Sequence, residues 1–260
     1  MKAYKLIALT GLLLAATLSI FAFKINNQQV IKSKASAENG FAVVELFTSE
    51  GCSSCPPADE LIARILKEDK EQHIYILAYH VDYWNHLGWK DQFSSAEYSN
   101  RQRRYAQQLH LESVYTPQIV VNGRTEFVGS NEVSLRNAIK SNLSKTVNDQ
   151  LMLGATGIEL HQLKIQYQIK GNIANKALVI ALVQKAAQSS VKSGENGGHI
   201  LRHVNIVREL NTIDLNQQNG TATVKLPQGY NQQTWEVICF LQNSATSEIL
   251  SAQKTVPSNI

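Results

Sequence analysis

The fold of the first half of the chain is decided by the stretch Thr48-Ser49-Glu50-Gly51-Cys52-Ser53-Ser54-Cys55-Pro56-Pro57. A short apolar, β-prone run precedes it at 41–47, and apolar residues at helical spacing follow it at 58–70. Cys52 and Cys55 therefore lie at a predicted strand-to-helix turn. Two cysteines separated by two residues at such a turn are typical of a redox pair or of half a metal site.

The segments that follow predict a parallel strand pair and then a hairpin. A second buried strand is expected at 74–79, and strand, helix and strand within this length imply a right-handed crossover. An insertion at 80–111 comes next, first rich in aromatic residues and then forming a polar helix. Thr116-Pro117 leads into two β-prone runs separated by Asn122-Gly123, which is a strong hairpin signal. A further amphipathic helix is expected after the hairpin.

This order of strand, Cys-x-x-Cys, helix, strand, Thr-Pro, hairpin and helix is the minimal thioredoxin fold. In that arrangement the first cysteine lies at a helix start, where free N–H groups and the helix dipole favour the thiolate. The second cysteine resolves the mixed disulfide. Pro117, expected in the cis form after Thr116, lies against the pair and leaves nearby backbone groups available to an extended partner. The predicted catalytic residues are therefore Cys52, Cys55, Thr116 and Pro117, with Cys52 reachable by solvent.

Polar and aromatic residues of the insertion supply further candidates. His80 follows the second strand, and it is either a functional group or a hydrogen-bonded histidine at a strand end. Asp82 beside it is a candidate proton-transfer group or a capping residue. Trp84 and Trp89 either form a rim above the cysteines or pack in a core. The three arginines of the insertion helix are expected on a solvated face: Arg101, Arg103 and Arg104.

Three functions fit the cysteine pair. The first is thiol–disulfide exchange with protein or peptide thiols and disulfides, which needs no organic cofactor. The second is a non-catalytic binding protein in which the disulfide is structural. The third is copper handling, because thiolates suit Cu(I) and His80 would add a ligand. Glu50, Asp59 and Glu60 place negative charge near the pair, which opposes thiolate formation.

The second half of the chain has a different texture. From about residue 151, short β-prone runs alternate with turn-rich segments, which predicts an all-β sandwich over 151–260. The thioredoxin-like α/β domain is expected at 38–150. The polar stretch 194–199 is interpreted as an ordinary loop of the sandwich, and the alternative is that it folds back onto the active face, with His203 or Arg208 assisting. Cys239 is interpreted as a buried small apolar residue.

The N-terminus predicts export. Residues 1–5 carry two lysines, and 6–23 form an uncharged apolar run, so 1–37 is expected to be a signal peptide or a membrane anchor with a linker. The body would then be periplasmic or extracellular, where disulfides persist. Five of the 25 basic residues precede Glu38, the first acid, and 20 basic residues face 21 acidic ones in the remainder. Nucleic-acid binding has no electrostatic support from this balance.

Several of these motifs together resemble a known family. The chain is similar to secreted thioredoxin-like proteins that are grouped as a domain of unknown function. The resemblance implies the fold and the export of the protein, and it implies no activity. It rests on four stretches: 44–59, 79–84 with 87–91, 115–123, and 194–196 followed by 203–208.

Overall fold

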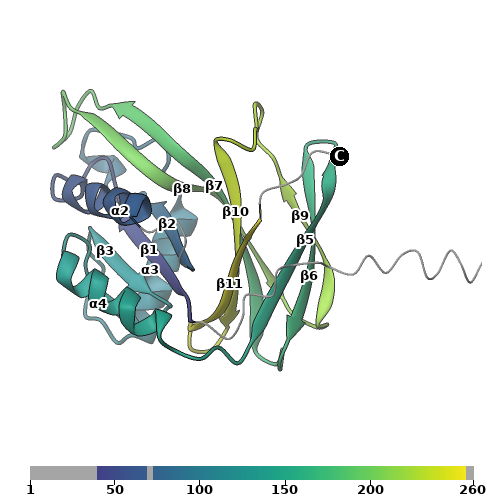
Figure 1. Cartoon of the computed structure of the whole chain (residues 1–260). Helices are drawn as coiled ribbons and strands as arrows, with labels where there is room; N and C mark the ends of the chain where they lie inside the picture. Colours follow the sequence, from purple (N-terminus) through teal and green to yellow (C-terminus); the bar gives the residue numbers. More distant parts are fainter. Residues whose placement is uncertain (1–39, 69–72, 256–260) are drawn as a thin grey trace, which may run out of the picture. The chain divides into compact units, whose positions relative to one another are not determined.

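The computed structural model describes residues 40–68 and 73–255, which all belong to one compact unit (Figure 1). The predicted leader at 1–37 lies outside the described residues. Within the described ranges, no helix is both long and apolar enough to cross a membrane.

The first half of the chain forms a four-stranded part of a sheet. Strand β1 (Ala42–Thr48) is buried along its whole length and pairs in parallel with β2 (Ile74–His80). On its other side, β1 pairs antiparallel with β3 (Gln118–Val121), which continues into β4 (Thr125–Val128). Asn122 has a φ of 49° in the intervening turn, and this confirms the predicted hairpin.

Helices α2 (Pro56–Glu68), α3 (Ala96–Gln108) and α4 (Glu132–Leu143) flank these strands, with a short 3-10 turn, η1 (Asn85–Leu87), in the insertion. Two prolines begin α2, which is tolerated because N–H groups of a first turn have no intrahelical acceptor. The starts of the other two helices are capped by side chains, Ser95 for α3 and Asn131 for α4.

The regular elements described in the second half are all strands, and together with those of the first half they form two sheets. One sheet has three strands in the order β5-β6-β9, and the other has eight in the order β11-β10-β7-β8-β2-β1-β3-β4. The strands are β5 (Gln150–Glu159), β6 (Gln162–Lys170), β7 (Lys176–Ser190), β8 (Ile200–Asp214), β9 (Asn219–Lys225), β10 (Trp235–Asn243) and β11 (Ile249–Thr255).

The larger sheet crosses the expected domain boundary at residue 150. Strand β8 lies beside β2 in parallel, with Ala78 opposite Ile206. The side chain of Asn205 donates a hydrogen bond to the carbonyl oxygen of Ile76 at 3.1 Å, which extends this contact. Four strands expected in a separate sandwich therefore continue the sheet of the first half. They do so because β7 and β10 are apolar on both faces and need a covering layer on each.

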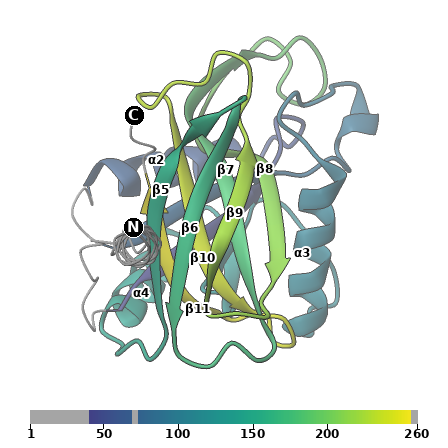
Figure 2. The ribbon, with the colours of Figure 1, turned by 90° about the vertical axis from the view of Figure 1, so that its right-hand side faces the viewer.

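Three cores fill the space around the larger sheet. One face packs against α3 along both halves of the sheet. The opposite face packs against α2 and α4 at the β1–β3 end. At the β7–β10 end the same face packs against the three-stranded sheet, which lies in front of β10 in Figure 2. Two sheets thus pack face to face at this end, and the larger one continues into the first half of the chain.

A buried ion pair connects the two halves under α3. The Arg101 side chain donates from Nε to Glu45 Oε1 at 2.7 Å and from Nη1 to Gln242 at 3.2 Å. Tyr105 donates to the other oxygen of Glu45. Burial disfavours the charged guanidinium, but Glu45 and the nearby tyrosines hold the pKa of Arg101 well above its usual value. The expectation that all three arginines are solvated is wrong for Arg101, which faces the core, whereas Arg103 and Arg104 are exposed.

We expect Arg101→Met to lower the free energy of unfolding by about 3–5 kcal/mol, because the Glu45 carboxylate would stay buried without its cation. Urea denaturation followed by circular dichroism measures this change. The matched control, Arg104→Met on the exposed face, should alter stability by less than about 0.5 kcal/mol. The double variant Glu45→Gln/Arg101→Met should recover part of the loss. Equal effects of the two arginine substitutions would contradict a stabilising role for the buried pair.

Candidate functional site

Cys52 and Cys55 form a disulfide at the turn between β1 and α2. The carbonyl oxygen of Cys55 accepts hydrogen bonds from the N–H groups of Ala58 and Asp59, so the second cysteine is built into the start of the helix. Neither cysteine has any exposed surface. The expectation that solvent reaches Cys52 is therefore wrong for this structure.

The segment 191–199, here called the covering loop, closes over the disulfide. It connects β7 to β8 at the α2 end of the larger sheet (Figure 1). Asn196 donates from Nδ2 to the carbonyl oxygens of Glu50 at 2.9 Å and Cys52 at 3.0 Å. Glu195 accepts from the N–H of Ser53 at 2.9 Å, and the Ser53 hydroxyl together with this N–H lowers the pKa of its carboxyl. The loop therefore binds the cysteine turn directly, unlike the ordinary sandwich loop that the sequence favoured.

Thr116 and Pro117 are linked to the same turn by a tryptophan. The Thr116–Pro117 peptide bond is cis. Trp84 donates from Nε1 to Thr116 Oγ1 at 2.8 Å, and its Cβ lies only 3.1 Å from where a side chain at Gly51 would begin. Gln118, the next residue after Pro117, is opposite Phe47 in the β1–β3 pairing. The Thr-Pro segment and the cysteine turn thus lie side by side, at the ends of the neighbouring strands β3 and β1.

The second tryptophan of the insertion also contacts the cysteine turn. Trp89 donates from Nε1 to Glu50 Oε2 at 2.7 Å. Both tryptophans are partly buried and use their single polar atom in a hydrogen bond, as buried indoles usually do. The aromatic insertion therefore packs against the cysteine turn and fixes Glu50, which lies just before Cys52.

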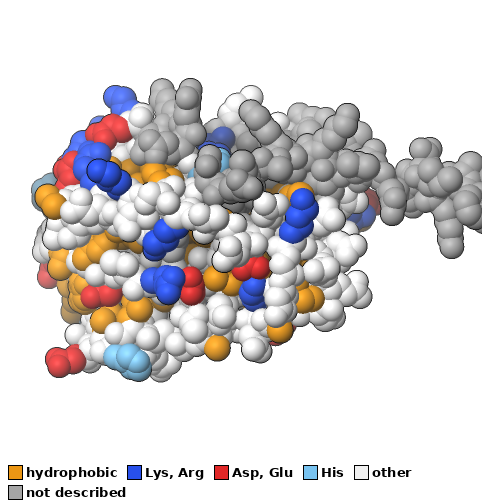
Figure 3. All heavy atoms as spheres, turned by 60° about the horizontal axis from the view of Figure 1, so that its bottom comes forward, with side chains coloured by type: hydrophobic (Ala, Val, Ile, Leu, Met, Phe, Trp, Pro, Cys, Tyr) orange, Lys and Arg blue, Asp and Glu red, His pale blue; other side chains and the backbone are white. Residues whose placement is uncertain are grey.

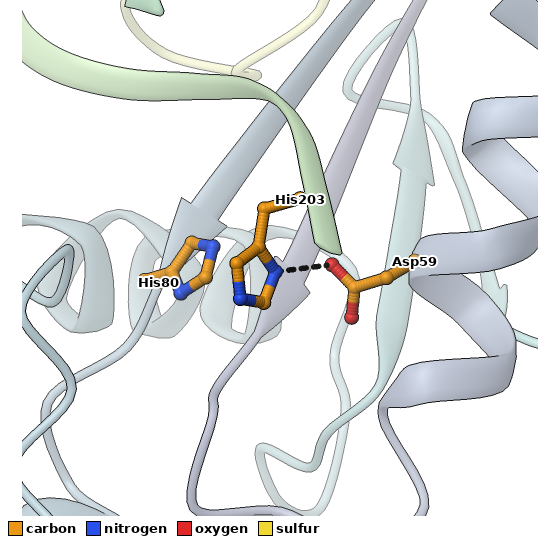
Figure 4. Close-up of side chains that lie close together, drawn as sticks. All are labelled: Asp59, His80 and His203. Atoms are coloured by element: carbon orange, nitrogen blue, oxygen red, sulfur yellow. Dashed lines mark hydrogen bonds and ion pairs between the residues drawn. The ribbon is translucent and has the colours of Figure 1, made fainter. Parts of the chain in front are cut away.

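A buried cluster of charged groups lies beside the cysteine turn, and Figure 4 shows three of its members. Asp59 comes from α2, His80 from the end of β2 and His203 from β8. Nδ1 of His203 lies 3.4 Å from Asp59 Oδ1, and its Nε2 lies 3.3 Å from Glu50 Oε1. Nδ1 of His80 is bonded to Asp91 Oδ2 at 2.7 Å. These five side chains are all nearly inaccessible to solvent.

The electrostatics of the cluster favour a cation in its centre. Burial alone would lower the pKa of His203, but interactions with Asp59 and Glu50 raise it to about 9. Burial alone would raise the pKa of Asp91, but His80 and the N–H groups of Glu50 and Phe93 hold it below its usual value. Asp91 is thus an ionised carboxylate that fixes the ring of His80.

The structure divides the predicted site residues into three groups. Cys52, Cys55, Thr116 and Pro117 gather around the turn, while His80 belongs to the charged cluster. Asp82 stands apart, because its Oδ1 accepts from Ser99 Oγ of α3 at 2.5 Å. The carboxylate that serves His80 is Asp91, eleven residues further along the chain.

Sequence reasoning missed the cluster because its members are distant in the chain. Asp59 and His203 are 144 residues apart and meet only when β8 lies beside β2. The sequence marks Glu50 and Asp59 only as charges near the cysteines, and His203 only as a member of one of the family-like stretches. No spacing rule joins them, since the ligands of a compact motif lie within a few residues of one another.

Comparison with known proteins identifies the family. Residues 43–242 match the family described as "Protein of unknown function (DUF1223)", and the chain belongs to that family. A crystal structure of protein AGR_C_4864 from Agrobacterium tumefaciens is similar, with 27% identity and a TM-score of 0.66, over 86% of this chain and 98% of that one. HBP35 of Porphyromonas gingivalis shares the fold, with 15% identity and a TM-score of 0.57, over 84% of this chain and 76% of that one. No curated protein matches.

We expect Asn196→Ala to speed reduction of the disulfide by dithiothreitol roughly tenfold, because the loss of two hydrogen bonds makes opening of the covering loop easier by about 1–2 kcal/mol. Timed quenching with a thiol-alkylating reagent, followed by mass spectrometry, gives the rate. Asn172→Ala, in the turn between β6 and β7, is the matched control and should leave the rate unchanged. A rate for Asn196→Ala equal to that of the control would show that the loop does not limit access.

Proposed function

We propose that this protein is an exported thiol–disulfide oxidoreductase with a thioredoxin-like first half. The observation that carries the proposal is the disulfide between Cys52 and Cys55 at a strand-to-helix turn. Thr116 and cis-Pro117 lie just before β3, the strand that pairs with β1. Trp84 bridges the two segments through its bond to Thr116. An extended segment with a proline, next to a redox-active turn, can bind a partner chain through backbone hydrogen bonds.

The topology of the first half supports the same proposal. Strand β1 leads into the cysteine turn and lies between a parallel partner, β2, and an antiparallel partner, β3. Helices α2 and α4 cover one face of these strands and α3 the other. This is the arrangement that the element order predicts for a thioredoxin-like domain. The β-sandwich half would then be an addition that extends its sheet and supplies the covering loop.

The proposed reaction moves two electrons between two dithiol–disulfide pairs. A partner thiolate attacks Sγ of Cys52, the Cys52–Cys55 bond breaks, and Cys55 leaves as a thiolate that takes up a proton. The partner's second thiolate then attacks the partner sulfur of the mixed disulfide. Cys52 leaves as a thiolate that takes up a proton. The partner ends as a disulfide and the protein as a dithiol, and the reverse sequence reduces a partner.

Substrates of this reaction would be proteins or peptides with exposed thiols or disulfides. The covering loop must move for them to reach Cys52, since the sulfur atoms are buried when Asn196 and Glu195 are bonded to the turn. The charge distribution gives no support for nucleic-acid binding. On the face that Figure 3 shows, the described Lys and Arg side chains are scattered among acidic and apolar ones and form no continuous patch.

The burial of both cysteines favours a second candidate function. A disulfide with no exposed surface, held by side-chain bonds to Glu50 and Cys52 carbonyls, is also what a structural cross-link requires. The protein would then be a binding module, with the aromatic insertion and the covering loop as its recognition surface. The two candidates differ in the reduction potential that they require of the same bond.

We expect the Cys52–Cys55 pair to have a reduction potential above about −300 mV, because a pair that exchanges with cellular thiols must be reducible by them. Titration of the full chain in dithiothreitol buffers, with alkylation and mass spectrometry as the readout, gives the potential. The buried thiol Cys239 is an internal control, since it is not part of the disulfide. A potential well below −300 mV would reject the oxidoreductase and favour the structural cross-link.

We also expect Cys55→Ser to accumulate a mixed disulfide at Cys52 when it is mixed with a peptide disulfide, because the resolving thiol is absent. Cys52→Ser is the matched control and should trap much less. Intact-mass spectrometry counts the adduct on each variant. Equal trapping by the two variants would contradict the assignment of Cys52 as the sulfur that partners reach.

A further inference from the structure

We propose that Asp59, His80 and His203, with Glu50 beside them, form a binding site for a divalent first-row transition-metal ion such as Zn²⁺. Donor atoms of the first three residues all lie within 4.8 Å of one another. They come from three different elements and point toward one another in Figure 4. Two imidazole nitrogens with carboxylate oxygens are a donor set that suits zinc and its neighbours in the first row.

His80 supplies the first independent sign of a ligand. Its ring is completely buried, and Nε2 has no hydrogen-bond partner among the described residues. A buried ring nitrogen without a partner carries a free-energy cost that a metal ion would remove. Nδ1 is held by Asp91 at 2.7 Å. A carboxylate that orients a histidine through its far nitrogen is the usual support of a metal ligand.

Asp91 is itself held in place. Its Oδ2 accepts a hydrogen bond from the N–H of Glu50 at 2.9 Å, and its Oδ1 accepts one from the N–H of Phe93 at 2.8 Å. Phe93 also packs edge-on against both histidine rings. The ring of His80 therefore has a fixed orientation, with Nε2 as the nitrogen left for a ligand.

His203 and Asp59 complete the site. The contacts from His203 to Asp59 and Glu50 are long, at 3.4 and 3.3 Å, and both its Nε2 and Glu50 Oε1 lack a hydrogen bond in the described structure. A tetrahedral zinc ion with bonds of about 2.0 Å separates its donors by roughly 3.3 Å. Asp59 Oδ1 and His203 Nδ1, 3.4 Å apart, already lie near this spacing. Glu50 Oε1 faces the other ring nitrogen, Nε2, so it does not share with Asp59 an ion that is held by a single nitrogen of His203.

A pocket gives an ion a path to these residues. Its volume is about 440 Å³, and both Asp59 and His203 line it. The rest of its wall comes from Ser49, from α2 and from the first residues of β8, including Ile200, which is 55% exposed. The site is thus approached from the side of α2 and does not require the covering loop to open.

The proposed metal site is independent of the cysteines. Its ligands are nitrogen and oxygen atoms, so an ion can bind while the Cys52–Cys55 disulfide is closed. This separates it from copper handling, which needs the reduced thiolates. The metal proposal and the proposed function can therefore fail separately. Metal binding is measured in the oxidised protein, whereas thiol–disulfide exchange is measured through the reactions of Cys52 and Cys55.

The test is calorimetric titration of the oxidised full chain with Zn²⁺ after treatment with EDTA. We expect one ion per chain, and a melting temperature raised by about 5 °C or more at zinc concentrations one hundred times Kd. His80→Gln and His203→Gln should each weaken binding at least tenfold, and His86→Gln, on the exposed turn η1, should not. Cys52→Ser/Cys55→Ser should bind as tightly as the native chain.

Three results would overturn the proposal. They are the absence of zinc binding by the oxidised chain, binding unchanged in both cluster variants, and binding lost in the cysteine double variant. If the cluster variants fail to fold, Co²⁺ added to the native oxidised chain decides. We expect visible absorption typical of nitrogen and oxygen ligands with no thiolate-to-cobalt charge-transfer band. A thiolate band, or no change in the cobalt spectrum, would reject the site.

Discussion

The placement of β8 beside β2 is the constraint on which the rest of the structure depends. A single backbone register, Ala78 opposite Ile206, makes one sheet from two segments that are far apart in the chain. The Asn205 side chain strengthens the contact by bonding to Ile76. Because β8 begins at this end of the sheet, His203 lies against His80, with ring centroids 4.7 Å apart. The preceding loop then has only a short distance to span before it meets the cysteine turn.

Buried charge is the second consequence of this pairing. Three carboxylates and two imidazoles occupy a space with almost no solvent, and isolated charges there would be strongly unfavourable. The carboxylates of Glu50, Asp59 and Asp91 bond to a tryptophan, a threonine and backbone N–H groups as well as to the histidines. The same cluster therefore ties the insertion, α2, β2 and β8 together. It also provides a negative environment that a proton on His203 or a metal ion can neutralise.

The sequence could predict most local structure, because local structure depends on nearby residues. The Cys-x-x-Cys turn, the Asn122-Gly123 hairpin and the buried Cys239 follow from short-range patterns. The shared sheet and the charged cluster could not be predicted in this way. Strand β8 alternates like a sandwich strand, and nothing in its pattern specifies β2 as its neighbour. The burial of Arg101 could not be predicted for the same reason, since its partner Glu45 lies 56 residues away.

Access to the disulfide requires motion, whereas the charged cluster requires fixed positions, and both lie at the same end of the larger sheet. The covering loop is joined to the cysteine turn by a few side-chain hydrogen bonds from Asn196 and Glu195, so it is the element that opens at the lowest cost. The cluster is held from four elements and has no comparable means of opening. Thiol exchange would therefore use motion of the loop alone. The residues beneath it, from Glu50 to His203, would keep their positions and preserve the geometry of the cysteine turn while a partner is bound.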